Sequence, residues 1–581
     1  MRIGLRVNPR VARLSALVSL FCHLTADAAD WPQYRGPFAS GVDDSRRLPT
    51  SWNVETGENV RWHTPIPGLA HSSPIVAGDR VYVATAVGAS EADLKVGLYG
   101  DIESADDSGP HEWRLLALDR STGGVLWDVL AVKATPRVKR HTKASHCNST
   151  PATDGNYVVA LFGSEGLFCF DKAGQKVWSR DLGPMDSGYF ASPTAQWGFG
   201  SSPIIHDNKV IVLCDVQTNS FIAAYGLPDG RELWRTPRTD VPTWSTPTLV
   251  RTSDRAQIVV NGWRETAGYD FNTGARIWNL DGGGDIPVPT PIAAHGLIYL
   301  TSAHGRWRPL RALRPEAAGV ITPEDPGRTN AFIVWAHGRQ GSYMQTPLVA
   351  GERLYACNDM GILTCADART GKIHFSERIS RRSQGFTASP VSDGAHLYFA
   401  SELGNVFVVA AEEKLRVVGV RPLPETCMAS PAISQGVLFF RTRHHLFAIG
   451  EGGRSTGMKL SSQTAAASEP APLALKKADP ALVGVWQGTL QFGNSMLRVR
   501  FSIEETGTGM QGSVISLDQG NAKTDLTGVG ELDGVVHLRM DPMAAHFEGR
   551  WNAAKDQLTG TWNQLDSGLP LVLRKLGASE R

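Results

Sequence analysis

Polar and aromatic side chains recur just ahead of a repeated Ser-Pro or Thr-Pro dipeptide. Imidazole, amide and hydroxyl groups beside a tryptophan face suit a polar ligand, because such groups fix its orientation through hydrogen bonds. Lys143 and His146, near the second dipeptide, would join them if the dipeptides converge. The alternative is that these side chains only satisfy backbone groups of the loops. The ligand-facing candidates are His71, Asn148, Trp244, Gln345, Thr387 and Met428.

Familiar catalytic and metal-binding motifs are absent from the sequence. It contains no Gly-x-Ser-x-Gly, no His-Glu-x-x-His and no Walker-type loop. His444 and His445 are adjacent, but neighbouring residues of a strand point to opposite faces, so one metal site cannot easily use both. We therefore assign no catalytic, cofactor-binding or metal-binding residue.

The repeated dipeptide indicates how the chain positions these residues. Each copy precedes a short apolar run, a turn and a second strand, as in "SSPIVAGDRVYVAT" and "QTPLVAGERLYACN". A third strand, a turn and a fourth strand with an aromatic residue follow, as in "IAAYGLPDGRELW". Repetition of four strands every forty-odd residues is typical of a β-propeller blade. The prolines of the eight copies are Pro74, Pro151, Pro203, Pro247, Pro291, Pro347, Pro390 and Pro431.

A glycine stands four residues before the aromatic residue in each of five such turns. In "YDFNTGARIWNL", Asp270 opens the turn, Gly274 closes it and Trp278 follows. Aspartate bonds the amides that follow it, and glycine accepts the positive φ of a three-residue hairpin with a bulge. The phrase therefore predicts fold and not chemistry.

The two ends of the repeat array predict a closed ring. The copy at Pro431 lacks a fourth strand, whereas residues 58–66 form an orphan strand ahead of the first copy. Placing this N-terminal strand on the last blade completes an eight-bladed β-propeller and leaves no unpaired edge. Seven blades are the alternative.

Two insertions, at about 88–112 and 304–334, interrupt the regular spacing of the repeats. They are either functional loops or solvated hairpin extensions.

Other segments flank the propeller. Residues 1–28 are typical of a signal peptide, with arginines, a short apolar run and the triplet Ala26-Asp27-Ala28, so we expect a periplasmic or extracellular protein. We place the propeller at 29–450, a flexible linker at 451–480 and a small antiparallel β-barrel or sandwich at 481–577.

The net charge of the chain is close to zero, because 58 Lys and Arg residues balance 57 Asp and Glu residues. This balance argues against a nucleic-acid partner, which would require a basic surface.

The repeats resemble the pyrroloquinoline quinone (PQQ)-like β-propeller family over about residues 31–450. The phrases "DWPQYRGPFASGV", "HSSPIV", "GFGSSP" and "TWSTP" are similar to a secreted bacterial subgroup. The family holds PQQ-dependent alcohol dehydrogenases and non-catalytic relatives such as the propeller lipoprotein of the outer-membrane barrel assembly machinery. Its Asp-x-x-x-Gly-x-x-x-Trp phrase docks each blade against the next in both groups.

The resemblance also implies which residues a quinone-dependent enzyme of this family would contain. Such an enzyme typically clamps the ring between a tryptophan face and a disulfide of adjacent cysteines, although some quinoproteins lack the disulfide, and it binds Ca²⁺ through carboxylate and amide oxygens. This sequence has neither adjacent cysteines nor a haem motif. We expect the protein to be an exported, non-catalytic scaffold that binds an envelope protein or polymer. We expect it to hold no cofactor. The alternatives are a PQQ- and Ca²⁺-dependent oxidoreductase and a propeller that binds a small ligand or glycan.

Overall fold

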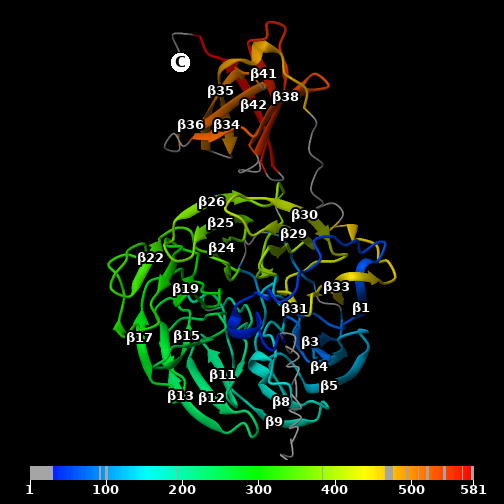
Figure 1. Cartoon of the computed structure of the whole chain (residues 1–581), viewed down its shortest axis with the longest axis vertical. Coiled ribbons are helices and arrows are strands. Elements are labelled where there is room, and N and C mark those ends of the chain that lie inside the picture. The colour runs from blue at the N-terminus through cyan, green and yellow to red at the C-terminus, as the bar shows by residue number, and fades with distance from the viewer. Residues whose placement is uncertain are drawn as a thin grey trace, which may run out of the picture.

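Eight antiparallel sheets surround a central axis in the computed structural model (Figure 1). The structure describes residues 30–577, except 91–92, 98–101, 193, 383, 463, 465–474, 493–494, 508, 519–522, 541–544 and 565–566. The predicted signal peptide therefore lies outside the described residues. Among the described residues, no helix has the length and hydropathy of a membrane span.

The sheets follow one another along the chain as blades 1 to 8. Blade 1 comprises β2 (Ile75–Ala77), β3 (Arg80–Gly88), β4 (His111–Asp119) and β5 (Val125–Ala134). Blade 2 comprises β6 (Ala152–Thr153), β7 (Tyr157–Leu161), β8 (Leu167–Asp171) and β9 (Lys176–Arg180), with η2 (Gly163–Glu165) between β7 and β8. Blade 3 comprises β10 (Ile204–His206), β11 (Lys209–Cys214), β12 (Phe221–Gly226) and β13 (Glu232–Pro237). Blade 4 comprises β14 (Thr248–Arg251), β15 (Ala256–Val260), β16 (Thr266–Asp270) and β17 (Arg276–Leu280).

The second half of the ring repeats this pattern. Blade 5 comprises β18 (Ile292–Ala294), β19 (Leu297–Thr301), β20 (Leu310–Leu313) and β22 (Ile333–His337). Blade 6 comprises β23 (Leu348–Ala350), β24 (Arg353–Cys357), β25 (Ile362–Asp367) and β26 (Ile373–Arg378). Blade 7 comprises β27 (Val391–Ser392), β28 (His396–Ala400), β29 (Asn405–Ala410) and β30 (Val417–Pro422). Blade 8 comprises β31 (Ala432–Ser434), β32 (Val437–Arg441), β33 (His445–Arg454) and β1 (Glu58–Pro65).

The N-terminal strand closes the last blade, as predicted. β1 pairs antiparallel with β33, with Trp62 opposite Ala448 and His63 opposite Phe447. The sheet order is β1-β33-β32-β31, so the first strand of the propeller is the outer strand of the eighth blade. Because the closure joins distant parts of the chain, both ends of the array contribute to one apolar core.

A chain of Ser and Thr hydroxyls explains the repeated Ser/Thr-Pro dipeptide. The amide of the Ser or Thr in one blade donates to the hydroxyl of its counterpart in the next blade. Seven such bonds, with N···O distances of 2.8–3.3 Å, link Ser73, Thr150, Ser202, Thr246, Thr290, Thr346, Ser389 and Ser430 in succession. The following proline fixes φ where each inner strand begins. The dipeptide thus joins neighbouring blades near the axis.

The turn glycine and the tryptophan join the blades farther out. At five junctions the Trp Nε1 donates to a backbone oxygen in the next blade, over 2.7–3.3 Å: Trp62 to Arg120, Trp127 to Lys172, Trp178 to Leu227, Trp234 to Phe271 and Trp335 to Ala368. The same rings cover the turn glycines Gly123, Gly174, Gly230, Gly274 and Gly371, where an added Cβ would approach within 2.4–3.0 Å. These glycines have φ of 65–86°. A side chain would therefore be strained and would collide with the ring.

Trp278 departs from this pattern. Its Nε1 donates to Gln257 Oε1 in its own blade, at 2.8 Å. The next blade replaces the tight turn by the extension 314–332, whose strand β21 (Gly319–Val320) pairs in parallel with β17. The insertion predicted at 304–334 is therefore narrower, because residues 310–313 form the third strand of blade 5. The extension serves as a fifth strand on blade 4.

The N-terminal segment before β1 lies against several blades. Trp31 and Val76 exchange backbone hydrogen bonds, and Val42 bridges Ser392. The segment includes η1 (Pro37–Ala39). Arg35 is buried and donates to the carbonyls of Pro347 and Pro390. This segment therefore ties blades 1, 6 and 7 together.

The C-terminal domain is one antiparallel sheet curled into a half-barrel, which confirms the predicted small β-domain. Its strands are β34 (Gly484–Phe492), β35 (Ser495–Thr506), β36 (Gly509–Ser516), β37 (Lys523–Asp525), β38 (Gly528–Leu532), β39 (Val535–Met540), β40 (Ala545–Trp551), β41 (Gln557–Gln564) and β42 (Ser567–Lys575), after η3 (Pro480–Leu482). The order is β37-β36-β35-β34-β42-β41-β40-β39-β38. Trp486 and Trp562 belong to its buried core, and the partly buried Trp551 packs against it.

The described parts of the segment between the domains are bonded to one domain or the other. The Met458 amide donates to the Val54 carbonyl of the propeller, whereas Lys476 pairs with Glu531 of the C-terminal sheet.

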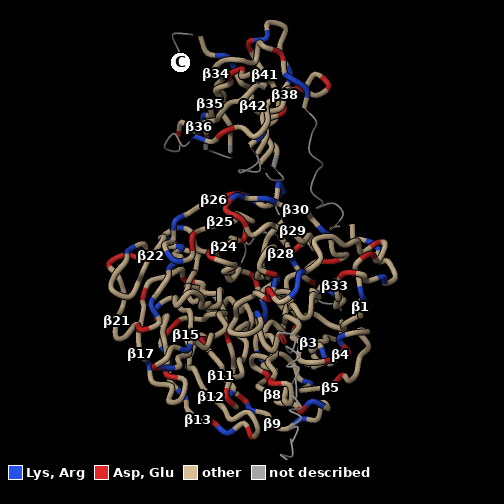
Figure 2. Tube along the Cα trace, viewed as in Figure 1, with Lys and Arg blue, Asp and Glu red and all other residues tan. Residues whose placement is uncertain are grey.

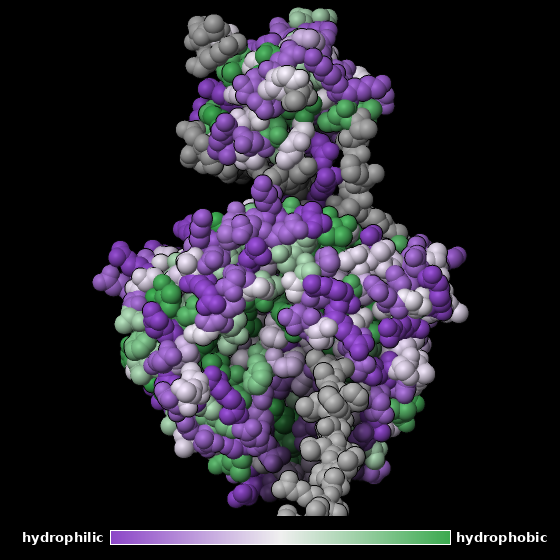
Figure 3. All heavy atoms as spheres, in the orientation of Figure 1, coloured by the Kyte–Doolittle hydropathy of each residue, from purple (hydrophilic) through white to green (hydrophobic). Residues whose placement is uncertain are grey.

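Lys and Arg are interspersed with Asp and Glu along both domains (Figure 2). On the face of the propeller seen in Figure 3, hydrophilic and hydrophobic residues are likewise intermixed.

Candidate functional site

A cavity of about 540 Å³ lies where the inner strands of the blades begin. The residue three positions before each repeated proline lines it in all eight blades. These residues are His71, Asn148, Gly200, Trp244, Val288, Met344, Thr387 and Met428. Five of the six predicted ligand-facing residues therefore face one cavity.

Gln345 is the exception and does not line the cavity. It stands two positions before its proline, and its side chain is fully buried. Its Nε2 donates to the carbonyl of Ala388 at 2.8 Å. Since successive side chains of an extended chain point to opposite sides, Met344 faces the cavity and Gln345 faces the neighbouring blade.

Tyr34 reaches the cavity from the N-terminal segment. Its hydroxyl is 3.1 Å from Ser389 Oγ, a member of the Ser/Thr chain around the axis. Tyr34 also lines the cavity. The N-terminal segment thus contributes to the floor of the site.

Aromatic rings form an arc along one side of the cavity. Tyr189 stacks on Trp197 with ring centroids 5.8 Å apart, and Trp197 lies 5.8 Å from Trp244. The His304 ring is 5.7 Å from Tyr189 and itself stacks on Tyr343 at 5.9 Å. All five rings line the cavity. Such an arc offers flat apolar faces to a ligand, whereas the indole nitrogens of Trp197 and Trp244 donate to the carbonyls of Ile102 and Gly198.

A buried ion pair crosses the site between distant parts of the chain. Lys143 Nζ lies 2.9 Å from Glu402, and their side chains are 5% and 0% exposed. Glu402 also accepts hydrogen bonds from the Thr387 hydroxyl at 2.5 Å and from the Gly97 amide at 2.7 Å. Burial raises the pKa of Glu402, against the opposing effects of Lys143, Thr387 and Gly97. Glu402 therefore ties Gly97 of the first insertion and the loop that carries Lys143 to blade 7.

The insertion also contributes to the cavity wall. Ile102 lines the cavity, and its carbonyl accepts from Trp197 Nε1 at 3.2 Å. Ser104 and Gln196 exchange hydrogen bonds of 2.8 and 3.0 Å. The first insertion is thus part of the site, and the alternative of a purely solvated hairpin does not hold for these residues.

Two of the predicted residues hold the loop that precedes blade 2. Asn148 accepts from the Ser145 amide and donates to the Phe199 carbonyl, both at 3.0 Å. His71 Nε2 lies 3.0 Å from the Lys143 carbonyl, and burial lowers the pKa of His71 to about 4. The neutral His71 ring therefore donates to this carbonyl at neutral pH, and both residues order the loop 143–148.

His146 lies elsewhere. It belongs to a second cavity of about 330 Å³, together with Asp107, His111 and His444. Lys143, by contrast, lines the first cavity, as predicted.

The cavity lining does not match the oxygen shell that Ca²⁺ requires. Among the described lining residues Asp359 is the one carboxylate, and burial raises its pKa. Asn148 Oδ1 is already engaged by Ser145. Ca²⁺ prefers six to eight oxygen ligands, several of them carboxylate. The six cysteines of the described chain are all free and buried, so none supplies a disulfide clamp for a quinone ring.

Comparison with solved structures finds two kinds of similar propeller. BamB from Moraxella catarrhalis is 14% identical, with 63% of this chain and 98% of that chain covered and a TM-score of 0.43. A europium-containing methanol dehydrogenase is 12% identical, with 71% and 89% covered and a TM-score of 0.47.

Comparison of sequences points to one family. The outer membrane protein assembly factor BamB of Shewanella oneidensis is 23% identical over 300 residues, which are 50% of this chain and 70% of that protein. The family model described as outer membrane protein assembly factor BamB matches residues 41–189 and 169–419. Because this match covers more than half of the chain, the protein belongs to the BamB family of PQQ-like β-propellers.

Proposed function

We propose that this protein is a non-catalytic scaffold of the cell envelope, and that its axial cavity binds a segment of a partner protein or polymer. The family supports the class of function, since its relative in Shewanella oneidensis is an outer membrane protein assembly factor. The expected signal peptide supports the location.

The observation that carries the proposal is the composition of the cavity. An aromatic arc of five rings faces polar groups of which several are held by the protein itself. A rigid aromatic surface with few free polar groups suits binding of apolar or aromatic side chains flanked by hydrogen-bonding groups.

Substitution at Met344 tests this proposal. Met344→Lys places an ammonium group in the cavity, whereas Met344→Leu keeps an apolar side chain of similar volume. Wild type and each variant are used to recover partners from the native envelope. We expect wild type and Met344→Leu to recover the same partner, and Met344→Lys to recover about tenfold less. Equal recovery by Met344→Lys would place the binding surface elsewhere.

A small polar ligand or glycan is the second candidate. The stacked pair Tyr189 and Trp197 favours it, because flat rings pack well against the faces of sugar rings. Binding of defined oligosaccharides, measured by calorimetry, separates the two candidates. Saturable binding that Met344→Lys abolishes would favour the ligand-binding function over the scaffold.

A further inference from the structure

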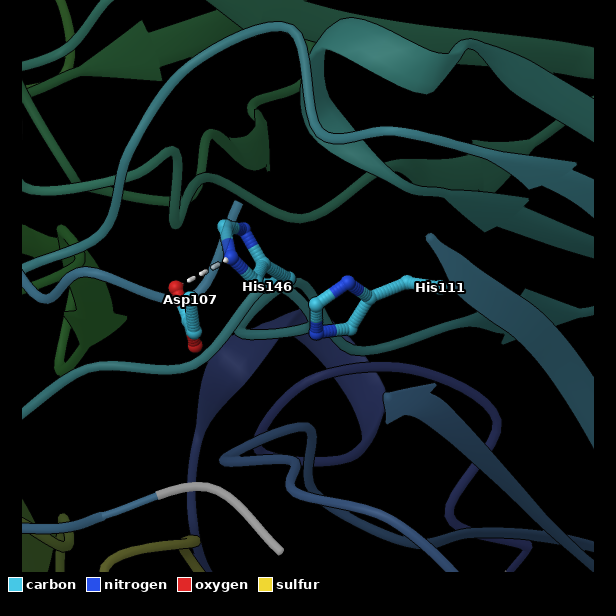
Figure 4. Close-up of side chains that lie close together, drawn as sticks. All are labelled: Asp107, His111 and His146. Atoms are coloured by element: carbon cyan, nitrogen blue, oxygen red, sulfur yellow. Dashed lines mark hydrogen bonds and ion pairs between the residues drawn. The ribbon is translucent and has the colours of Figure 1, made fainter. Parts of the chain in front are cut away.

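The second cavity contains two imidazoles and a carboxylate that no motif of the sequence brings together (Figure 4). Asp107 belongs to the insertion between β3 and β4, His111 is the first residue of β4, and His146 lies in the loop before blade 2. One ligand atom from each of these residues lies within 4.8 Å of the other two. This is the one such group of at least three potential metal ligands among the residues that the structure describes.

We propose that Asp107, His111 and His146 bind a divalent transition-metal ion, with Zn²⁺ the representative case. Two imidazole nitrogens and one carboxylate oxygen form a common ligand set for zinc with an open position. Ligand atoms around tetrahedral zinc lie about 3.4 Å apart, because each bond is about 2.1 Å long. A contraction of at most about 1.4 Å, which small side-chain rotations can provide, therefore suffices to close the site.

The tautomer of His111 favours metal binding. Its Nδ1 donates to the Gly109 carbonyl at 2.7 Å, which leaves the lone pair on Nε2. A hydrogen bond of this kind on the second ring nitrogen commonly orients histidine ligands of metals. Gly88 provides the space beside Nε2, since a Cβ there would lie 2.9 Å from this atom.

A hydrogen bond from Arg140 also orients the Asp107 carboxylate for metal binding. Arg140 Nε donates to Asp107 Oδ2 at 2.6 Å, whereas Oδ1 faces His146 Nε2 at 3.1 Å. The remaining nitrogens of Arg140 donate to the carbonyls of Asp93, His141 and Ala144. The guanidinium thus orients the carboxylate and leaves Oδ1 for the metal, which would replace the hydrogen bond from His146.

The open position would face the second cavity. This cavity of about 330 Å³ is also lined by Arg443 and His444, which lie between β32 and β33 of blade 8. A bound ion would therefore carry water or an anionic ligand there. It would also fix the insertion, which carries Asp107 and also supplies Ile102 to the axial cavity.

Titration with Zn²⁺ alone tests the proposal on the full mature chain after dialysis against a chelator. We expect calorimetry to give one Zn²⁺ per chain, and His111→Ala and Asp107→Asn to weaken binding by about tenfold or more. His396→Ala is the matched control, because His396 lies 3.4 Å from a carboxylate oxygen of Asp393 on blade 7 but belongs to no group of three potential ligands among the described residues. This variant should bind as wild type does.

Co²⁺ provides a second readout that separates ligand loss from misfolding. Four-coordinate Co²⁺ with imidazole ligands has visible absorption bands, which should appear in wild type and His396→Ala and be absent in His111→Ala. Unfolding of each metal-free variant shows whether it is folded. Less than one equivalent of Zn²⁺ bound to wild type, or an unchanged affinity in a folded His111→Ala variant, would overturn the proposal.

Discussion

The turn glycine of blade 6 allows a measurement of how much the contact between blades 5 and 6 contributes to stability. Gly371 has a φ of 73°, and an added Cβ would lie 2.6 Å from Trp335 Cδ2 of blade 5. Gly351 has a φ of 56° in the same blade, and no atom lies within 4 Å of its added Cβ. The two glycines therefore share the backbone requirement and differ in the contact.

Substitution of each glycine by alanine separates these two effects. The left-handed conformation costs about 1–2 kcal/mol for alanine, and both variants bear this cost along with the same change in the unfolded chain. Gly371→Ala bears in addition the cost of overpacking against a ring that is 5% exposed, about 1–3 kcal/mol. We thus expect Gly371→Ala to lower the free energy of unfolding by about 2–5 kcal/mol and Gly351→Ala by about 1–2 kcal/mol.

Urea unfolding followed by tryptophan fluorescence measures both values. A double-mutant cycle adds the physical cause, because Trp335→Leu removes the ring that meets the new Cβ. In the Trp335→Leu background, Gly371→Ala should cost no more than Gly351→Ala. Equal destabilisation of the two single variants in the wild-type background would refute the role of the turn in docking blades.

Three further predictions concern other parts of the propeller. Deletion of residues 31–66 removes β1 and the N-terminal segment, so the melting temperature of the propeller should fall sharply; an unchanged value would contradict closure by β1. Lys143→Met leaves Glu402 buried without its ion-pair partner and should cost about 3–5 kcal/mol in urea unfolding, whereas a cost near zero would show that the pair is not coupled. His71 has a folded pKa of about 4 against about 6.5 when unfolded, so the unfolded chain binds the proton first as the pH falls. Between about pH 6.5 and 4, wild type should therefore lose about 3 kcal/mol relative to His71→Gln, and parallel pH profiles would contradict this.

The blades could be predicted from the sequence because each blade uses the same local chemistry. The Ser/Thr-Pro dipeptide and the Asp-to-Gly turn recur, and both are explained by bonds to the neighbouring blade. The orphan strand at 58–66 could be placed because the last blade lacked one strand. Repetition therefore identified the fold and the ring of residues at its axis.

The unique contacts could not be predicted in the same way. The dipeptide pattern predicts Gln345, whereas Met344, one position earlier, lines the cavity, because successive side chains of an extended chain point to opposite sides. Tyr189 and Trp197 belong to the long connection between blades 2 and 3, where no repeat gives their position. The unusual length and aromatic content of this connection were the one feature of the sequence that could have indicated a role for it in the site. The bond from Gly97 to Glu402 joins residues more than 300 positions apart, and no local pattern encodes it.

Reconstitution with a quinone tests directly whether the propeller is non-catalytic. Purified protein is incubated with PQQ and Ca²⁺, desalted, and examined for retained cofactor absorbance and for dye-linked alcohol oxidation. Because the axial cavity has one described carboxylate and the described cysteines form no disulfide clamp, we expect neither retention nor turnover. Retention of one PQQ per chain together with alcohol oxidation would contradict it.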